Sequence, residues 1–142
     1  FPEKRALALE LGAAMAVAPG EEAAVAGSDV VIETVGKAAV LATAYASARR
    51  GGRIVTVGLP NPADDLAINA LSIVADNKSL MGSYMGESIP ARDIPRYIAL
   101  WRAGKLPVER LLTSISPLEE INELMDLLAA GKAVRQVVVP GW

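Results

Sequence analysis

Short apolar runs that alternate with helical patterns are the feature that most constrains the fold of this chain. The runs Asp29–Thr34 and Arg53–Val57 hold consecutive apolar residues, which is typical of strands buried on both faces of a parallel sheet. Between them, residues 37–49 carry apolar side chains at helical spacing. The buried face of this helix would consist of Val40, Leu41, Ala44 and Ala48.

The same alternation extends toward both ends of this region. The further elements that we expect are a helix over 2–11, a weak strand over 14–17, a brief helix over 21–26, a helix over 69–75 and a strand over 79–83. Helices that alternate with strands in this way predict an α/β protein with a parallel sheet and crossover helices.

The C-terminal part of the chain has helix and strand signals of its own. Asp93 can cap a helix that has Pro95 in its first turn, and residues 116–119 form a capping box for a second helix. Two strands are expected, at Leu111–Ile115 and Arg135–Val139. The loop Gly86–Pro90 has the composition of a boundary between structural units.

The composition excludes several kinds of chemistry from this chain. It contains no cysteine and no histidine, so it offers neither a thiolate nor an imidazole as base or metal ligand. With 14 basic and 16 acidic residues the net charge is −2, and the lack of a basic stripe argues against a nucleic-acid partner. No run approaches the ~20 apolar residues of a membrane span. Because no signal peptide opens the chain either, we expect a cytoplasmic protein.

The first residues read as the first turn of a helix. Pro2 suits the first helical position, and no initiator methionine precedes it. We therefore interpret the chain as a fragment or a processed product.

Several short motifs follow one another in a fixed order along nearly the whole chain. The first group is Asp29–Gly36, Arg50–Pro60 and Leu80–Gly86. The second group is Ile94–Tyr97, Ala103–Pro107, Pro117–Glu123 and Gly131–Val138. In this order and spacing, the first group resembles the medium-chain dehydrogenase/reductase superfamily. The second group resembles its zinc-type alcohol dehydrogenase branch.

The resemblance implies an incomplete Rossmann-like parallel sheet made of the later strands, followed by C-terminal elements of the catalytic domain. Residues 1–85 would be part of the dinucleotide-binding domain, and residues 86–142 would pack with a catalytic domain that lies outside this chain. In the strand order 3-2-1-4-5-6, the segment 14–17 would be strand 3, and the following three strands would be strands 4 to 6.

Two consequences follow from this partial sheet. The Asp29–Thr34 strand would have an unpaired edge, and the segment 14–17 would lose its only neighbour. Because unpaired backbone groups on an apolar edge attract other chains, we expect the isolated chain to self-associate or to leave its first residues poorly packed.

The resemblance also implies an activity for the parent protein, which would transfer a hydride between NAD(P)H and an alcohol or a carbonyl. The family's glycine-rich pyrophosphate turn, its acidic ribose-binding residue and its zinc ligands would all lie upstream of Phe1. Zinc would thus belong to the parent only. The chain alone would hold no catalytic residue and no metal ligand and would be inactive. Its partners would be NAD or NADP, the missing N-terminal part of the same protein, and further copies in a homo-oligomer.

The resemblance places the cofactor at the carboxyl ends of the strands, where open α/β sheets bind ligands. The residues implied are Val57, Gly58 and Leu59 at the nicotinamide; Ser83, Tyr84 and Met85, through their backbone, at its carboxamide; and Thr34, Val35 and Gly36 at the adenine or ribose. From the residues alone, the three segments can be interpreted as an ordinary turn, a polar strand end and a helix N-cap.

Two charged residues, Lys4 and Arg135, complete the candidate set, and a third, Glu33, stays outside it. By resemblance, Lys4 lies near the adenosine ribose, although an exposed lysine in a first helical turn is usually only solvated. Arg135 matches an arginine that reaches the cofactor phosphates, a task that suits its forked donors; otherwise it is a solvent-facing residue at a strand start. Glu33 lies inside an apolar strand with no recognisable partner base, and it is assigned no role.

Other functions remain open at this stage. The zinc-free quinone-reductase branch shares the cofactor domain, and a non-catalytic nucleotide-binding or structural module is a further possibility. A methyltransferase-like Rossmann protein is disfavoured because the tail after Ser83 follows the dehydrogenase order. The substrate and the choice between NAD and NADP depend on residues outside this chain.

Overall fold

The computed structural model describes residues 1–141, which divide into two compact units. One unit is Gly12–Ser88, hereafter the sheet unit. The other joins Phe1–Leu11 to the described part of Ile89–Trp142, hereafter the tail unit. The border between the two units lies between Ser88 and Ile89, inside the loop 86–90, where the sequence predicts a boundary. The first helix, however, belongs to the tail unit. The assignment of residues 1–85 and 86–142 to a dinucleotide-binding and a catalytic domain stays a prediction.

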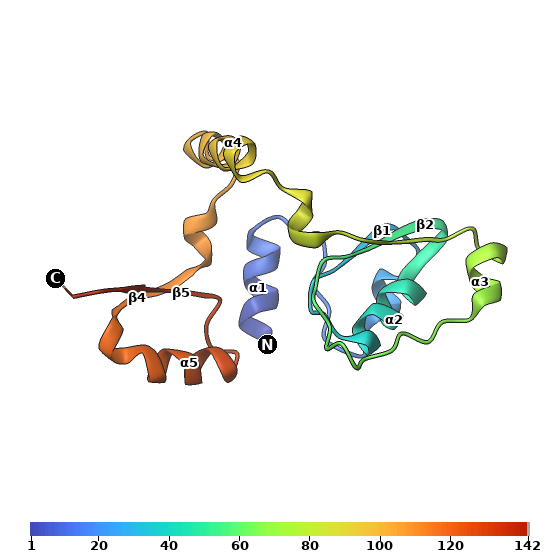
Figure 1. The fold of residues 1–142 in the computed structure, drawn as a ribbon, viewed down its shortest axis with the longest axis horizontal. Coiled ribbons are helices and arrows are strands. Elements are labelled where there is room, and N and C mark those ends of the chain that lie inside the picture. Colours follow the sequence, from blue (N-terminus) through green and yellow to red (C-terminus); the bar gives the residue numbers. More distant parts are fainter. Residues whose placement is uncertain (142) are drawn as a thin grey trace. The chain divides into compact units, whose positions relative to one another are not determined.

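A three-stranded parallel sheet forms the centre of the sheet unit (Figure 1). Its strands are β1 (Ser28–Glu33), β2 (Ala48–Thr56) and β3 (Ser79–Gly82), in the order β1-β2-β3. The crossovers are α2 (Ala38–Ser47) and α3 (Ala70–Ala75), and a short 3-10 helix, η1 (Glu22–Val25), precedes β1. The predicted α/β class with a parallel sheet and crossover helices is therefore confirmed.

Helix α2 packs against one face of this sheet. The buried cluster consists of Ala44, Tyr45, Ala48 and Ile54, with Val31, Leu41 and Ile68 packed partly buried against it. Val40, which was expected on the buried face of the helix, is exposed, whereas Tyr45, which was not expected there, is buried. Ile54 is fully buried, whereas 64% of Ile32 is exposed. The prediction that the β1 segment is buried on both faces is wrong, because in the described residues only one face of β1 is covered.

The segment 14–17 forms no strand, which corrects the prediction made for it. A strand needs a ladder of backbone hydrogen bonds to a neighbour, and no strand of the two described sheets pairs with this segment. Gly51 and Gly52 lie inside β2, where the pairing with β1 shifts register between Ser28 and Val30.

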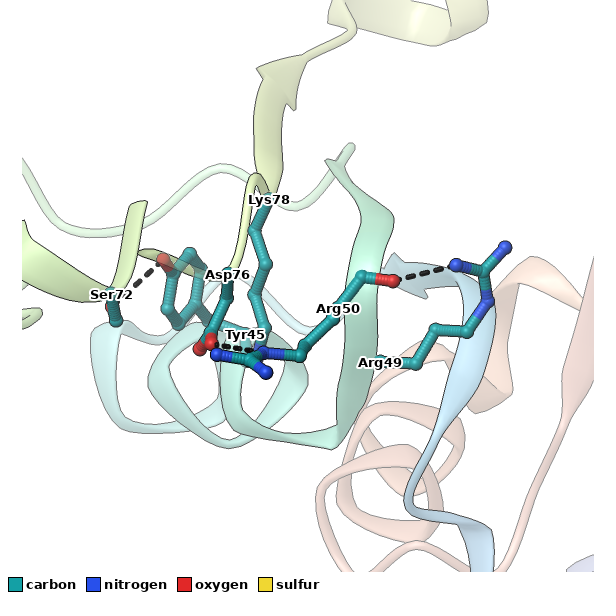
Figure 2. A network of polar contacts seen from close by, with 6 residues as sticks. All are labelled: Tyr45, Arg49, Arg50, Ser72, Asp76 and Lys78. Atoms are coloured by element: carbon teal, nitrogen blue, oxygen red, sulfur yellow. Dashed lines mark hydrogen bonds and ion pairs between the residues drawn. The ribbon is translucent and has the colours of Figure 1, made fainter. Parts of the chain in front are cut away.

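A polar network joins the helices to the amino ends of the strands (Figure 2). The Tyr45 hydroxyl lies 2.9 Å from that of Ser72, and the Lys78 ammonium donates to the Tyr45 carbonyl oxygen over 2.9 Å. On the neighbouring turn, Arg50 pairs with Asp76 at 3.0 Å. These contacts fix α2 and α3 at the edge of the sheet opposite to the carboxyl ends of the strands.

The tail unit holds three helices and a two-stranded parallel sheet within its described part. Its elements are α1 (Pro2–Glu10), α4 (Pro90–Arg102), β4 (Leu112–Pro117), α5 (Ile121–Ala129) and β5 (Arg135–Val139), with short 3-10 helices at Val108–Leu111 and Leu118–Glu120. Leu124 and Ala133 are its buried apolar residues. No described helix has the length and apolar character needed to cross a membrane.

Two predicted helix starts in the tail unit are wrong. Helix α4 begins at Pro90, and Asp93 lies inside its first turns, where its carboxylate accepts a hydrogen bond of 2.8 Å from the Ile89 backbone N–H. Asp93 thus reaches back to the helix start instead of preceding it. The capping box at 116–119 does not form, because Ser116 belongs to β4 and pairs with Val138.

Candidate functional site

The carboxyl ends of β1, β2 and β3 lie side by side at one edge of the sheet. In the parallel register, Glu33 lies opposite Thr56, and Thr56 lies opposite Gly82. The residues that directly follow each strand, hereafter the exit of that strand, therefore lie next to one another. This arrangement brings together the sequence segments that the resemblance assigned to a cofactor.

A hollow of about 350 Å³ lies between the exits of β2 and β3. Its lining consists of Thr56, Val57, Gly58, Leu59, Gly82, Ser83 and Tyr84. The Ser83 backbone N–H donates to the Thr56 carbonyl oxygen over 2.9 Å, which holds the two exits together. The Leu59 and Tyr84 side chains are largely exposed. The hollow thus combines predicted site residues from two strand ends, and two of its lining residues, Gly58 and Gly82, have no side chain.

The exit of β1 touches the exit of β2 through two glycines. A Cβ atom on Gly58 would collide with the backbone nitrogen of Gly36, and a Cβ on Gly36 would lie 2.7 Å from the Leu59 carbonyl oxygen. Gly36 also has a φ of +75°, which favours glycine. The two predicted segments therefore meet backbone to backbone, at a distance that no side chain would allow.

Glu33 is the buried acid of this region, with 3% of its surface exposed. Its Oε1 accepts hydrogen bonds from the backbone N–H groups of Val35 (2.6 Å) and Gly36 (2.8 Å). Its Oε2 accepts from the Thr56 hydroxyl over 2.8 Å. Burial raises the pKa of Glu33, but the bonds from Thr56, Gly36 and Val35 together lower the pKa by more, so it lies below the ordinary value of 4.5.

Sequence reasoning gave Glu33 and Thr56 no role, although one signal was present. An acid at the end of an apolar strand must find donors when it is buried. Its donors come from its own turn and from a residue 23 positions away. Without the register of β1 and β2, the sequence cannot name Thr56 as the partner.

The other predicted site residues lie away from this hollow. Thr34 and Val35 line a separate hollow of about 530 Å³ along β1 and α2. Met85 has a φ of +51° and a largely exposed side chain, and it does not line the hollow between β2 and β3.

Lys4 and Arg135 belong to the tail unit. The Lys4 ammonium lies 5.1 Å from the centre of the Phe1 ring, and Arg135 begins β5 opposite Leu112. Because they lie in a different unit from the strand ends, their roles toward a cofactor stay predictions.

The described residues offer no group of three or more His, Cys, Asp or Glu side chains that could hold a metal ion. Zinc therefore does not fit the side chains of this part of the chain.

Comparisons with known proteins agree on one family. Residues 1–102 match the family described as zinc-binding dehydrogenase. A geraniol dehydrogenase from Castellaniella defragrans is 34% identical over 145 residues, which cover 96% of this chain and 39% of that protein. The chain therefore spans about two-fifths of the length of this relative.

Two solved structures share the fold. The first, an alcohol dehydrogenase zinc-binding domain protein from Burkholderia ambifaria, is 28% identical with a TM-score of 0.90, over 97% of this chain and 39% of that one. The second, a zinc-binding dehydrogenase from Sinorhizobium meliloti bound to NADP, is 26% identical with a TM-score of 0.84, over 99% of this chain and 43% of that one.

Proposed function

Because the chain belongs to the zinc-binding dehydrogenase family, we propose that it forms part of the nicotinamide-cofactor site of a longer oxidoreductase. That protein would transfer a hydride between NAD(P)H and an alcohol or a carbonyl. The coverage of about two-fifths of a relative's length supports a longer parent protein. The family resemblance implies that the further part is N-terminal. Assembly into a homo-oligomer and a cytoplasmic location stay predictions.

The observation that carries this proposal is the gathering of three strand ends around glycine contacts and an open hollow. Ligands of open α/β sheets bind outside the carboxyl ends of the strands. Gly36 and Gly58 bring two backbones into contact at this edge, and Val57, Gly58 and Leu59 line the hollow beside them. Two of its lining residues, Gly58 and Gly82, carry no side chain, which leaves room for a flat ring.

The residues of this chain would bind and orient the cofactor, which supplies the hydride. The backbone of Val57, Gly58 and Leu59, with that of Ser83, would hold the nicotinamide end. Thr34, Val35 and Gly36 would contact the adenosine end. Lys4, Met85 and Arg135 remain proposed contacts from the family resemblance. No acid, base or metal ligand of the reaction is proposed within this chain.

The test is to titrate a full-length protein that contains this chain with NADH and with NADPH, and then to assay alcohol oxidation with the cofactor that binds. We expect saturable binding of at least one cofactor, and turnover of an alcohol by the full-length protein but not by residues 1–142 alone. Absence of binding for both cofactors would overturn the proposal. Binding without turnover of any alcohol or carbonyl, quinones included, would favour a non-catalytic nucleotide-binding module. Turnover of quinones alone would favour the quinone-reductase branch.

A further inference from the structure

We propose that Glu33 and Thr56 form a positioning pair that sets the separation between the adenosine side and the nicotinamide side of the site. This inference rests on the proposed function, because it names which turns face the two halves of the cofactor. The adenosine side is the Val35–Gly36 turn, and the nicotinamide side is the Val57–Leu59 turn. Neither Glu33 nor Thr56 would touch the reacting atoms.

The first step of the argument is the number of donors that Glu33 collects. Its carboxylate accepts from the backbone N–H groups of Val35 and Gly36 and from the Thr56 hydroxyl. Its own carbonyl oxygen accepts from the Val57 backbone N–H over 2.9 Å. One residue thus holds both turns, the first through its side chain and the second through its main chain and through Thr56.

The second step is the connection from Thr56 to the third strand. The Thr56 hydroxyl donates to Glu33, while the Thr56 carbonyl oxygen accepts from the Ser83 backbone N–H at 2.9 Å. A continuous line of hydrogen bonds therefore runs from the exit of β1 through the exit of β2 to the exit of β3. Each of the three segments proposed to contact the cofactor is attached to this line.

The third step concerns charge. No Lys or Arg side chain of the described residues forms an ion pair with Glu33. Its negative charge is stabilised by neutral donors that belong to the site turns and to Thr56. Burying a charge is costly, and the carboxylate offsets this cost by accepting from two backbone amides and one hydroxyl. An apolar side chain could not accept these hydrogen bonds and so could not hold the turns.

The fourth step relates this geometry to binding. A dinucleotide is a single ligand that must reach both turns at once, whereas ADP-ribose lacks the nicotinamide and does not occupy that side. Loosening the pair should therefore weaken binding of the whole dinucleotide more than binding of ADP-ribose. General destabilisation of the protein would not change the ratio of the two affinities.

The experiment uses a full-length protein that contains this chain, together with the cofactor that the wild type prefers. Dissociation constants for the reduced dinucleotide and for the matching ADP-ribose, with a 2′-phosphate if NADPH is preferred, are measured by calorimetry. The variants are Glu33→Gln, Thr56→Val and Thr56→Ser. Tyr45→Phe is the matched control, because it removes a hydrogen bond to Ser72 at the opposite edge of the same sheet.

We expect Glu33→Gln to weaken binding of the dinucleotide by about tenfold, as for the loss of one charge-assisted hydrogen bond, and binding of ADP-ribose by about twofold at most. Thr56→Val should change the ratio in the same direction, and Thr56→Ser, which keeps the hydroxyl, should restore it. Tyr45→Phe should leave the ratio unchanged.

Equal losses for both ligands, or no loss, in Glu33→Gln and Thr56→Val would overturn the positioning role while leaving the proposed function intact. If Glu33→Gln does not fold, the comparison of Thr56→Val with Thr56→Ser decides the question. A wild type that binds neither dinucleotide would overturn the proposed function and the positioning role together.

Discussion

The sheet unit has two edges that differ in how many of their polar and backbone groups find hydrogen-bond partners within this chain. At the carboxyl ends of the strands, Glu33, Thr56 and Ser83 satisfy one another through hydrogen bonds. Along the lateral edge, β1 pairs with β2 on one side only. Val30 and Ile32 are exposed on the uncovered face of the same strand. A hollow of about 530 Å³ lies beside β1 and α2.

This difference separates what the chain can build alone from what it needs a neighbour to complete. The carboxyl edge takes its shape from glycine contacts and from a buried carboxylate, all within residues 33–83. The lateral edge presents unpaired backbone groups, which water or another segment must satisfy. We therefore expect changes at the carboxyl edge to alter stability and cofactor binding, and changes at the lateral edge to alter association.

The largest effect is expected from Gly58→Ala. Its Cβ would collide with the backbone of Gly36 and Val35, and forcing the two turns apart should lower the free energy of unfolding by roughly 3 kcal/mol. Urea unfolding of the full-length protein measures this change. Gly82→Ala is the matched control, because nothing lies within 4 Å of its added Cβ. Similar stabilities for the two variants would contradict the close approach at the carboxyl edge.

The next largest effect is expected on cofactor binding when a charged residue of the tail unit, Arg135, is replaced. Arg135→Ala in the full-length protein should cost roughly 1.5–3 kcal/mol of cofactor binding, as expected when a charge-assisted contact to a phosphate is lost. Lys4→Ala should have little effect if Lys4 is merely solvated. Calorimetric titration with the preferred cofactor gives both values. An unchanged dissociation constant for Arg135→Ala would assign that residue to the solvent-facing start of β5.

A smaller effect is expected at the lateral edge. We predict that residues 1–142 alone self-associate, and that Ile32→Lys weakens this association about tenfold, because a lysine on an edge strand opposes pairing with another chain. Sedimentation at several concentrations measures the association. Val74→Lys, which changes an apolar residue on α3 that is 81% exposed, serves as the control. A monomeric chain, or equal effects of both variants, would show that the chain does not self-associate through the β1 edge.

The smallest predicted effect is a dependence on pH at the carboxyl edge. Burial raises the pKa of Glu33, and the bonds from Thr56, Gly36 and Val35 lower it further than burial raises it. Because the folded pKa lies below the unfolded one, the stability that Glu33 contributes is complete above about pH 4.5 and is lost as the pH falls through the folded pKa. The difference in unfolding free energy between wild type and Glu33→Gln should thus be constant from pH 7 to 5 and shrink at lower pH. A difference that persists unchanged well below pH 4.5 would refute this assignment.

The order of elements and the parallel sheet were predictable because their signals are local. Apolar runs and helical periods gave β1, α2, β2, α3 and β3, and the same patterns gave the two parallel strands of the tail unit. Where the prediction failed, the answer depended on distant residues. The segment 14–17 had a strand-like composition, but in the described structure no neighbouring strand pairs with it.

The turns that form the candidate site were predictable, but the hydrogen bonds that hold these turns in place were not. The resemblance identified the turns after the strands, and the structure brings Val57–Leu59 and Ser83 into one hollow. The role of Glu33 could not be predicted, because its partner Thr56 lies on another strand. Likewise, the grouping of α1 with the C-terminal residues depends on contacts between opposite ends of the chain, such as the ion pair of Glu10 with Arg110.

The most direct test of the central claim, that the carboxyl ends of β1, β2 and β3 form one wall of a nicotinamide-cofactor site, is amide hydrogen exchange of the full-length protein with and without saturating cofactor. We predict slower exchange at residues 34–36, 57–59 and 82–84 when the cofactor is bound. The polar network around Tyr45 and Lys78 should show no change, as an internal reference within the same unit. Cofactor binding that leaves the amides of all three strand ends unchanged would contradict the claim.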